Sequence, residues 1–414
     1  MDDEVIPSKN LRDYGYVEHD LSGSDMRNMD LSYKPFIRSK MRETRLSRSN
    51  LHSSDLSAAD LLGADLYNAD LTNAHLKDTA LENTNLMDAD LSHAYLVGAR
   101  LANANLYRSK FGGSDLSKTD FGIGPNFEGA SFIRVALTRQ NLSKSNCRET
   151  KFRSSNLQDV DFRGADLTDT DFTNADLTGA NLCGANLDGT IFSGTNLSHS
   201  NFFQCDLSKA KGFDGANFNK ANMRKAVLRN CKLNGNNFSE ANLSLADLSR
   251  SSLQNTDFQN AILNRASLNF SNASDAIFLR AELHSADFRG AELCNCNFWN
   301  TDLRSAQMQN SQLAGTKMRR ARLSISQLRD CDLSLIDLHG INLSNMEISD
   351  LSFINLDLHD AQFMGATLTN VDFTNTKLHR ADFSRTLLKN CTFTGSHRFM
   401  ADFQDSVQHD CVFG

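Results

Sequence analysis

The residues of this chain that could do chemistry are nine cysteines, 11 histidines and 50 acidic side chains. Cysteine and histidine at suitable spacing would bind zinc, and paired carboxylates would serve as acid and base. Cys294-Asn295-Cys296 lacks the spacing of zinc ligands. The chain shows no GxGxxG, Walker, HExxH or nucleophile-elbow motif. We therefore predict no catalytic, cofactor-binding or metal site, and no enzyme.

The chemistry-bearing residues sit in a repeat with a period of five, as in Ala59-Asp60-Leu61-Leu62-Gly63. We call the large apolar residue of each unit its centre. Centres recur at every fifth residue over 11–121, 127–207 and 213–413. The two phase slips, near 122–126 and 208–212, are rich in Gly or Lys and predict loops.

A period of five matches neither the strand period of two nor the helix period of 3.6, so short extended pieces must alternate with turns. The small residue two before each centre should point inward with it. Phenylalanines spaced by twenty indicate that four units complete one coil, and we expect them to form a structural ladder. This ladder comprises Phe218, Phe238, Phe258, Phe278 and Phe298.

The tandem A(D/N)LXX units resemble the pentapeptide-repeat family. The resemblance implies an all-β fold, a right-handed quadrilateral parallel β-helix of about 20 coils of 20 residues. We expect residues 1–18 to form an irregular N-terminal cap and residues 19–414 to form a single β-helix.

The repeat accounts for most of the cysteines and acids. Asp and Asn alternate just before the centres, where a short polar side chain would bond nearby backbone at the bend. Six cysteines occupy the small inward position, which predicts packing in a reducing compartment and no metal. They are Cys205, Cys231, Cys296, Cys331, Cys391 and Cys411.

Two features go beyond the repeat. Charge alternates along the chain, from net −7 over 156–208 to net +5 over 303–330. Within the second band a basic cluster falls on one side of a coil and its corner, and it is the best candidate contact for an anion or an acidic partner. This cluster comprises Lys317, Arg319, Arg320 and Arg322.

One outward column, taken at steps of twenty residues, is rich in planar side chains. We expect Arg319 to lie against Trp299 and the three histidines to stack. Three interpretations stay open: a plain ladder on a solvated face, a protein-binding hot spot built on Trp299 and Arg319, or a histidine metal site. The column comprises Leu279, Trp299, Arg319, His339, His359, His379 and Phe399.

Composition limits the setting of the protein. The chain has no apolar run of about 18 residues and does not begin with a signal-peptide pattern, so we expect no membrane span and a cytoplasmic location. Some family members are secreted effectors, and the sequence leaves open whether this protein is one of them. A net charge of −7 predicts no direct binding of nucleic acid. Phe413 is a good centre close to the last residue, so we expect a homodimer through the C-terminal coil.

Two functions follow. The first is a non-enzymatic bacterial scaffold that binds protein partners through its outward faces. The alternative, implied by the resemblance to quinolone-resistance members of the family, is a DNA mimic that binds DNA gyrase and protects it from topoisomerase poisons. A mimic of the whole expected length of about 95 Å would need about 55 negative charges. Only a stretch such as 156–208 could imitate DNA, and only locally.

Overall fold

The structure is a computed structural model that describes residues 16–323, 328, 331, 333 and 335–414. The described chain alternates tight turns with short bridged segments and contains no α-helix. The cap predicted over 1–18 lies outside the described residues except for 16–18. No helix within the described ranges is long and apolar enough to span a bilayer.

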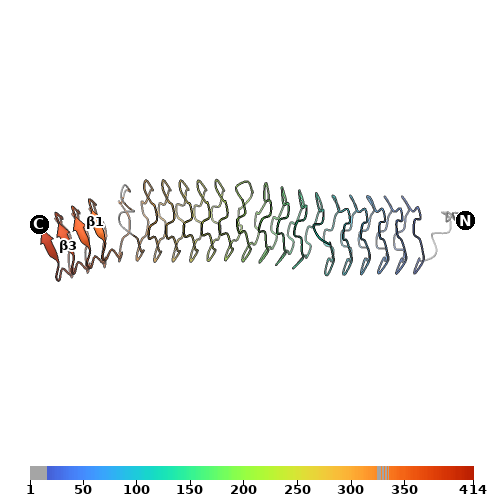
Figure 1. Ribbon diagram of the computed structural model, residues 1–414, viewed down its shortest axis with the longest axis horizontal. Coiled ribbons are helices and arrows are strands. Elements are labelled where there is room, and N and C mark those ends of the chain that lie inside the picture. Colours follow the sequence, from blue (N-terminus) through green and yellow to red (C-terminus); the bar gives the residue numbers. More distant parts are fainter. Residues whose placement is uncertain (1–15, 324–327, 329–330, 332, 334) are drawn as a thin grey trace. The chain divides into compact units, whose positions relative to one another are not determined.

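The chain divides into two units that repeat the same local structure. The first is Met1–Asn201 with Lys209–Gly212, and the second is Phe202–Ser208 with Phe213–Gly414. Within each unit, successive turns of the chain lie beside one another (Figure 1). The prediction of a single β-helix over 19–414 stays a prediction.

The turn explains the composition of the five-residue unit. The N–H three residues after a centre donates to the carbonyl of that centre, as Ala64 does to Leu61 at 2.9 Å. The residue between them, two after the centre, has a left-handed backbone, with φ of 66° at Gly63, and Gly, Asn and Asp tolerate this conformation best. The carboxylate before a centre accepts from the backbone two residues on, as Asp65 does from Tyr67 N–H at 3.1 Å. The predicted backbone bond at the bend is therefore present.

Neighbouring coils pair in parallel, twenty residues apart. In the second unit the pairing is regular enough to form four strands, β1 (Glu347–Ser349), β2 (Thr367–Thr369), β3 (Leu387–Lys389) and β4 (Val407–His409). They stack in chain order as one parallel sheet, shown as arrows in Figure 1. Elsewhere the same register is carried by single bridging residues, such as Asp65 opposite Asn85.

The register lengthens by one residue at each phase slip. In the first unit Lys110 pairs with Ser131, and in the second unit Asp206 pairs with Val227, each a step of 21 residues. The extra residue is taken up locally, so pairing resumes at twenty residues on the far side. A loop of this kind lets the inward columns continue without loss of register.

The core of the second unit contains the predicted phenylalanine ladder. All five rings are fully buried. Their centroids follow one another at 4.7, 5.4, 5.0 and 4.8 Å, with interplanar angles of 16° or less. The spacing matches the distance between adjacent strands, so every coil contributes one ring to the stack. These rings are therefore structural and do not form a binding stripe.

Four of the six cysteines predicted at the small inward position are buried, whereas Cys331 and Cys411 are only half-buried. All nine are free thiols. Cys205, Cys231, Cys296 and Cys391 are buried in the small inward position, and Cys147 is buried as a centre. Burial raises the pKa of Cys147 to about 12, which leaves this thiol protonated and unreactive.

Candidate functional site

The best candidate interface lies on one ladder of the second unit, which we call the tryptophan face. It consists of the outward side chains next to the centres Phe278, Phe298, Met318, Leu338, Leu358 and Leu378. Parallel bridges connect its coils without a break, from Ile277 through Asn297, Lys317, Asp337, Asp357 and Lys377 to His397. Since residues on either side of a centre point away from the core, two outward columns run side by side along this face.

The first coils of the tryptophan face expose apolar side chains. Trp299 is 43% exposed and Ile277 is 38% exposed, and Leu279, one coil before Trp299 in the same column, is half-buried. Aliphatic and aromatic side chains that gather on an otherwise polar surface often mark a contact with another protein. Sequence analysis missed Ile277. The signal was available, because isoleucine occupies an outward slot that normally holds Asp or Asn.

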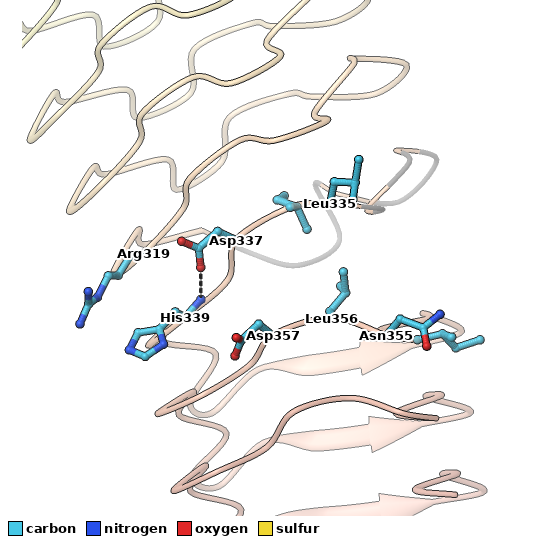
Figure 2. A pocket seen from close by; sticks show the side chains of 9 residues that line it. Arg319, Leu335, Asp337, His339, Asn355, Leu356 and Asp357 are labelled. Carbon is cyan, nitrogen blue, oxygen red and sulfur yellow. Dashed lines mark hydrogen bonds between the residues drawn. The ribbon is translucent and has the colours of Figure 1, made fainter. Parts of the chain in front are cut away.

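The expected contact between Arg319 and Trp299 is not formed. Among the described residues, cation–π contacts join Arg48 to Tyr67 and Arg250 to Phe270, for example, but none joins Arg319 to Trp299. Figure 2 shows Arg319 extending away from its coil. A cation–π contact at an exposed site is worth only about 0.5–1 kcal/mol, so a common column does not ensure that the contact forms.

The predicted histidine stack is confirmed. His339 and His359 lie 5.2 Å apart with an interplanar angle of 7°, and His359 and His379 lie 5.2 Å apart at 21°. His339 Nε2 is 3.5 Å from a carboxylate oxygen of Asp360. His379 Nδ1 is buried without a hydrogen-bond partner. In the part of the chain that the structure describes, no group of three or more potential ligands is arranged to hold a metal ion.

The basic cluster of Lys317, Arg319, Arg320 and Arg322 is exposed. None of its members forms an ion pair with another described residue. Elsewhere an arginine just after a centre often binds an acid, either the one just before the same centre, as Arg304 binds Asp302 at 2.6 Å, or one on the next coil, as Arg229 binds Asp247 at 2.7 Å. Arg319 has Lys317 just before its centre, and Arg320 lies between Asn300 and Gly340 in its column. Asp337 lies opposite Lys317 on the next coil, but none of the four cations pairs with it.

Arg322 has a carboxylate nearby, but that group is already occupied. Hydrogen bonds from Arg304 are the main cause of the lowered pKa of Asp302, and the charge of Arg322 adds a smaller effect. An exposed arginine that shares an acid already bound by another arginine keeps most of its capacity to bind a further anion.

A groove of about 670 Å³ opens beside the tryptophan face (Figure 2). Its apolar part includes Leu335, which is 80% exposed, and Ile354, which is 42% exposed. Its polar part includes Arg319, His339 and Asp337, whose carboxylate accepts a hydrogen bond from the backbone N–H of His339 at 3.0 Å. Sequence analysis missed Leu335 and Ile354, although both are aliphatic residues in outward slots. The groove extends the apolar and basic character of the face.

Acidic residues line up over at most two neighbouring coils in the bridged columns, as Asp70 and Asp90 do, and form no longer acidic column among the described residues. The column through Asp60 continues as Ala80, Arg100 and Asp120. In the acidic band over 156–208, Asp161 pairs with Asn181 and Asp166 pairs with Asn186. Neighbouring coils therefore interrupt the acidic columns with neutral or basic side chains, so the negative charge is not continuous along the axis.

The repeat family is identified by comparison with known proteins. The family model described as "Pentapeptide repeats (8 copies)" matches in overlapping segments that together span 36–122, 126–208 and 213–395. The chain belongs to the pentapeptide-repeat family. The gaps between these spans fall on the two loops where the register of this pentapeptide-repeat protein lengthens.

Several solved pentapeptide-repeat structures are similar to this chain. HetL from the cyanobacterium Nostoc, described as involved in regulating heterocyst differentiation, is 29% identical over 59% of this chain and 90% of its own, with a TM-score of 0.25. QnrB1, described as a plasmid-mediated fluoroquinolone resistance protein, is 18% identical over 49% of this chain and 92% of its own, with a TM-score of 0.26. A pentapeptide-repeat protein from the cyanobacterium Cyanothece is 23% identical over 38% and 89%, with a TM-score of 0.12. No curated protein sequence matches the chain.

Proposed function

We propose that this pentapeptide-repeat protein is a non-enzymatic scaffold that binds a protein partner through the tryptophan face. One observation carries the proposal: exposed apolar side chains and unpaired cations meet on adjacent coils of a single flat ladder. Lys317, Arg319 and Arg320 are exposed and form no ion pair with a described residue, so their charges are available to a partner. The proposal includes a cytoplasmic location in a bacterium.

The chemistry of the face suits a protein partner. Trp299 supplies a large, rigid contact area, and residues of this type are enriched among those that carry most of the binding energy at interfaces. Arginines at the rim would steer an acidic partner and fix its orientation more than they would add affinity. The histidine stack that follows continues the flat surface, because its rings lie nearly parallel. The face thus has an apolar centre with a polar margin.

The test is quantitative capture of partners by immobilised protein, comparing the wild type with a Trp299→Ser/His359→Ser double variant. Phe270→Ser is the matched control, because Phe270 is 61% exposed but belongs to a different ladder. We expect a protein that is captured by the wild type and by the control to be lost from the double variant, with thermal unfolding unchanged. A partner retained by the folded double variant would sink the proposal.

The alternative is that the chain binds DNA gyrase as a mimic of duplex DNA. It rests on the acidic band over 156–208, which carries net −7. The interrupted acidic columns weigh against it, because a duplex presents a charge about every 1.7 Å without a gap. Supercoiling of relaxed plasmid by gyrase, with and without a fluoroquinolone, tests it: inhibition or drug protection at low micromolar protein would favour the mimic over the scaffold.

The proposal extends to the form of the scaffold. We infer right-handed, four-sided coils, about 20 in number, because pairing at twenty residues joins every fourth unit. We also infer a homodimer through the C-terminal coil. Phe403 and Phe413 point inward there but are only half-buried, and the Arg398 guanidinium lies 5.3 Å from the centre of the Phe413 ring. A monomeric mass by light scattering at micromolar concentration would refute the dimer.

A further inference from the structure

Each coil bends after the tryptophan face, and a second hollow, of about 650 Å³, lies at this bend. Gly340 lines this hollow. In its outward column, Arg320 lies one coil before Gly340 and Asp360 lies one coil after it. The backbone of Gly340 is left-handed, with φ of 62°, and a Cβ there would approach only Arg320 Cγ, at 4.0 Å. The missing side chain therefore leaves space above one coil of an otherwise filled column.

The charges around this hollow are unequally satisfied. Arg320 and Arg322 line one side, and neither forms an ion pair with a described residue. On the other side Asp360 is engaged by Arg380 at 3.1 Å and by His339 at 3.5 Å. Asp360 is thus already paired, whereas the guanidinium groups of Arg320 and Arg322 still have donors to offer. With Arg380 and the second acid, Asp382, the lining holds three arginines and two aspartates, a net charge of +1. An anion that entered would meet uncompensated positive charge.

We propose that this hollow binds a carboxylate of an acidic protein segment, whose apolar side chain packs against Trp299 at the same time. The inference rests on the proposed function and names the class of partner. Carboxylates suit the site because a guanidinium presents two parallel donors that match their two oxygens. The coil of Trp299 is one or two coils away from the hollow, about 5–10 Å at the usual strand spacing. An extended segment covers this distance in two or three residues, so the motif is an apolar residue followed two or three positions later by Asp or Glu.

The surroundings favour a protein segment over a nucleic acid. Asp337 and Asp357 lie on the adjacent coils of the tryptophan face, and Asp382 lines the hollow beside Arg380. A nucleic acid strand would carry its closely spaced phosphates past these carboxylates, whereas a peptide can place one acid in the hollow and neutral residues elsewhere. The apolar residues Ile277 and Leu279 also suit an aliphatic side chain better than a base.

Trp299 makes the proposal directly measurable, because it is the only tryptophan in the chain. The probe is an acetylated and amidated peptide, Leu-Ser-Glu-Ser-Glu-Leu, titrated into the full chain while the fluorescence of Trp299 is recorded. The matched peptide has Gln in place of both Glu residues. We expect saturable binding of the acidic peptide, about tenfold tighter than that of its neutral counterpart, and weakened by added salt.

The decisive variant is Gly340→Asn, which fills the hollow with a residue that tolerates the left-handed backbone. Gly235→Asn is the control, since Gly235 has φ of 68° and open space around its Cβ position but lies on another ladder. We expect Gly340→Asn and Arg320→Gln/Arg322→Gln to weaken the acidic peptide about tenfold or more, and Gly235→Asn to leave its affinity unchanged.

Several results would overturn the proposal. They are absence of peptide binding, equal binding of the Glu and Gln peptides, or wild-type affinity in Gly340→Asn. Tighter binding of inorganic phosphate or of an oligo-dT strand, with the same dependence on Gly340 and Arg320, would instead assign the hollow to free anions or nucleic acid. If Gly340→Asn keeps a captured partner that Trp299→Ser/His359→Ser loses, the proposed function stands and the carboxylate site fails.

Discussion

Replacing Phe258 by alanine should destabilise the middle of the second unit while leaving the first unit intact. Phe258 is fully buried between Phe238, whose ring lies 5.4 Å away, and Phe278, whose ring lies 5.0 Å away. Removing a buried phenylalanine costs about 3–5 kcal/mol through lost burial and the remaining cavity. Phe258→Leu keeps most of the apolar volume but loses two stacked contacts of about 0.5–1.5 kcal/mol each, so it should cost about 1–3 kcal/mol.

Native-state hydrogen exchange followed by mass spectrometry measures this change coil by coil. Each coil contacts mainly its neighbours, so the loss of protection should centre on the coils around Phe258 and fade with distance. A cost of 3–5 kcal/mol corresponds to a fall in protection of about two to three and a half orders of magnitude. Phe270→Ala is the control: Phe270 is 61% exposed, and its protection should change by less than a factor of about three.

Two results would refute the reasoning about the ladder. If Phe258→Ala lowered protection equally in both units, the coils would not behave as a chain of neighbouring contacts. If Phe258→Leu lowered the free energy of unfolding as much as Phe258→Ala, the shape of the core would matter more than burial and ring stacking, on which the two expected costs are based.

Three further predictions concern thiols, turns and pH. Iodoacetamide at about pH 8 should label the half-buried Cys183 well before Cys147, whose pKa is raised to about 12 by burial, as peptide mapping would show. Asp372→Ala should cost about 1 kcal/mol in unfolding experiments, because the carboxylate accepts a backbone hydrogen bond at 2.8 Å, whereas Asp372→Asn should be nearly neutral. Hydrogen bonds from Arg304 hold the pKa of Asp302 below its ordinary value. The stabilisation from these bonds is complete above about pH 4 and is lost as pH falls through the lowered pKa. Asp302→Asn should therefore lose less thermal stability than the wild type between about pH 6 and pH 3.

The sequence by itself determined the coil. A period of five admits no helix, and phenylalanines at steps of twenty identify which residues share an inward column. The ladder from Phe218 to Phe298 and the stack of His339, His359 and His379 could therefore be predicted and are confirmed. Both follow from covalent spacing, because a fixed register brings any residue beside its counterpart one coil away.

The tertiary structure decided which outward side chains interact. Arg319 follows Trp299 in its column but extends into solvent, and Arg322 lies near an acid that Arg304 already holds. Register places the backbone, but long exposed side chains choose among several rotamers, nearby acids and water, and these choices differ little in free energy. The hollow at Gly340 likewise depends on the absence of a side chain between particular neighbours, which only the packed coils reveal.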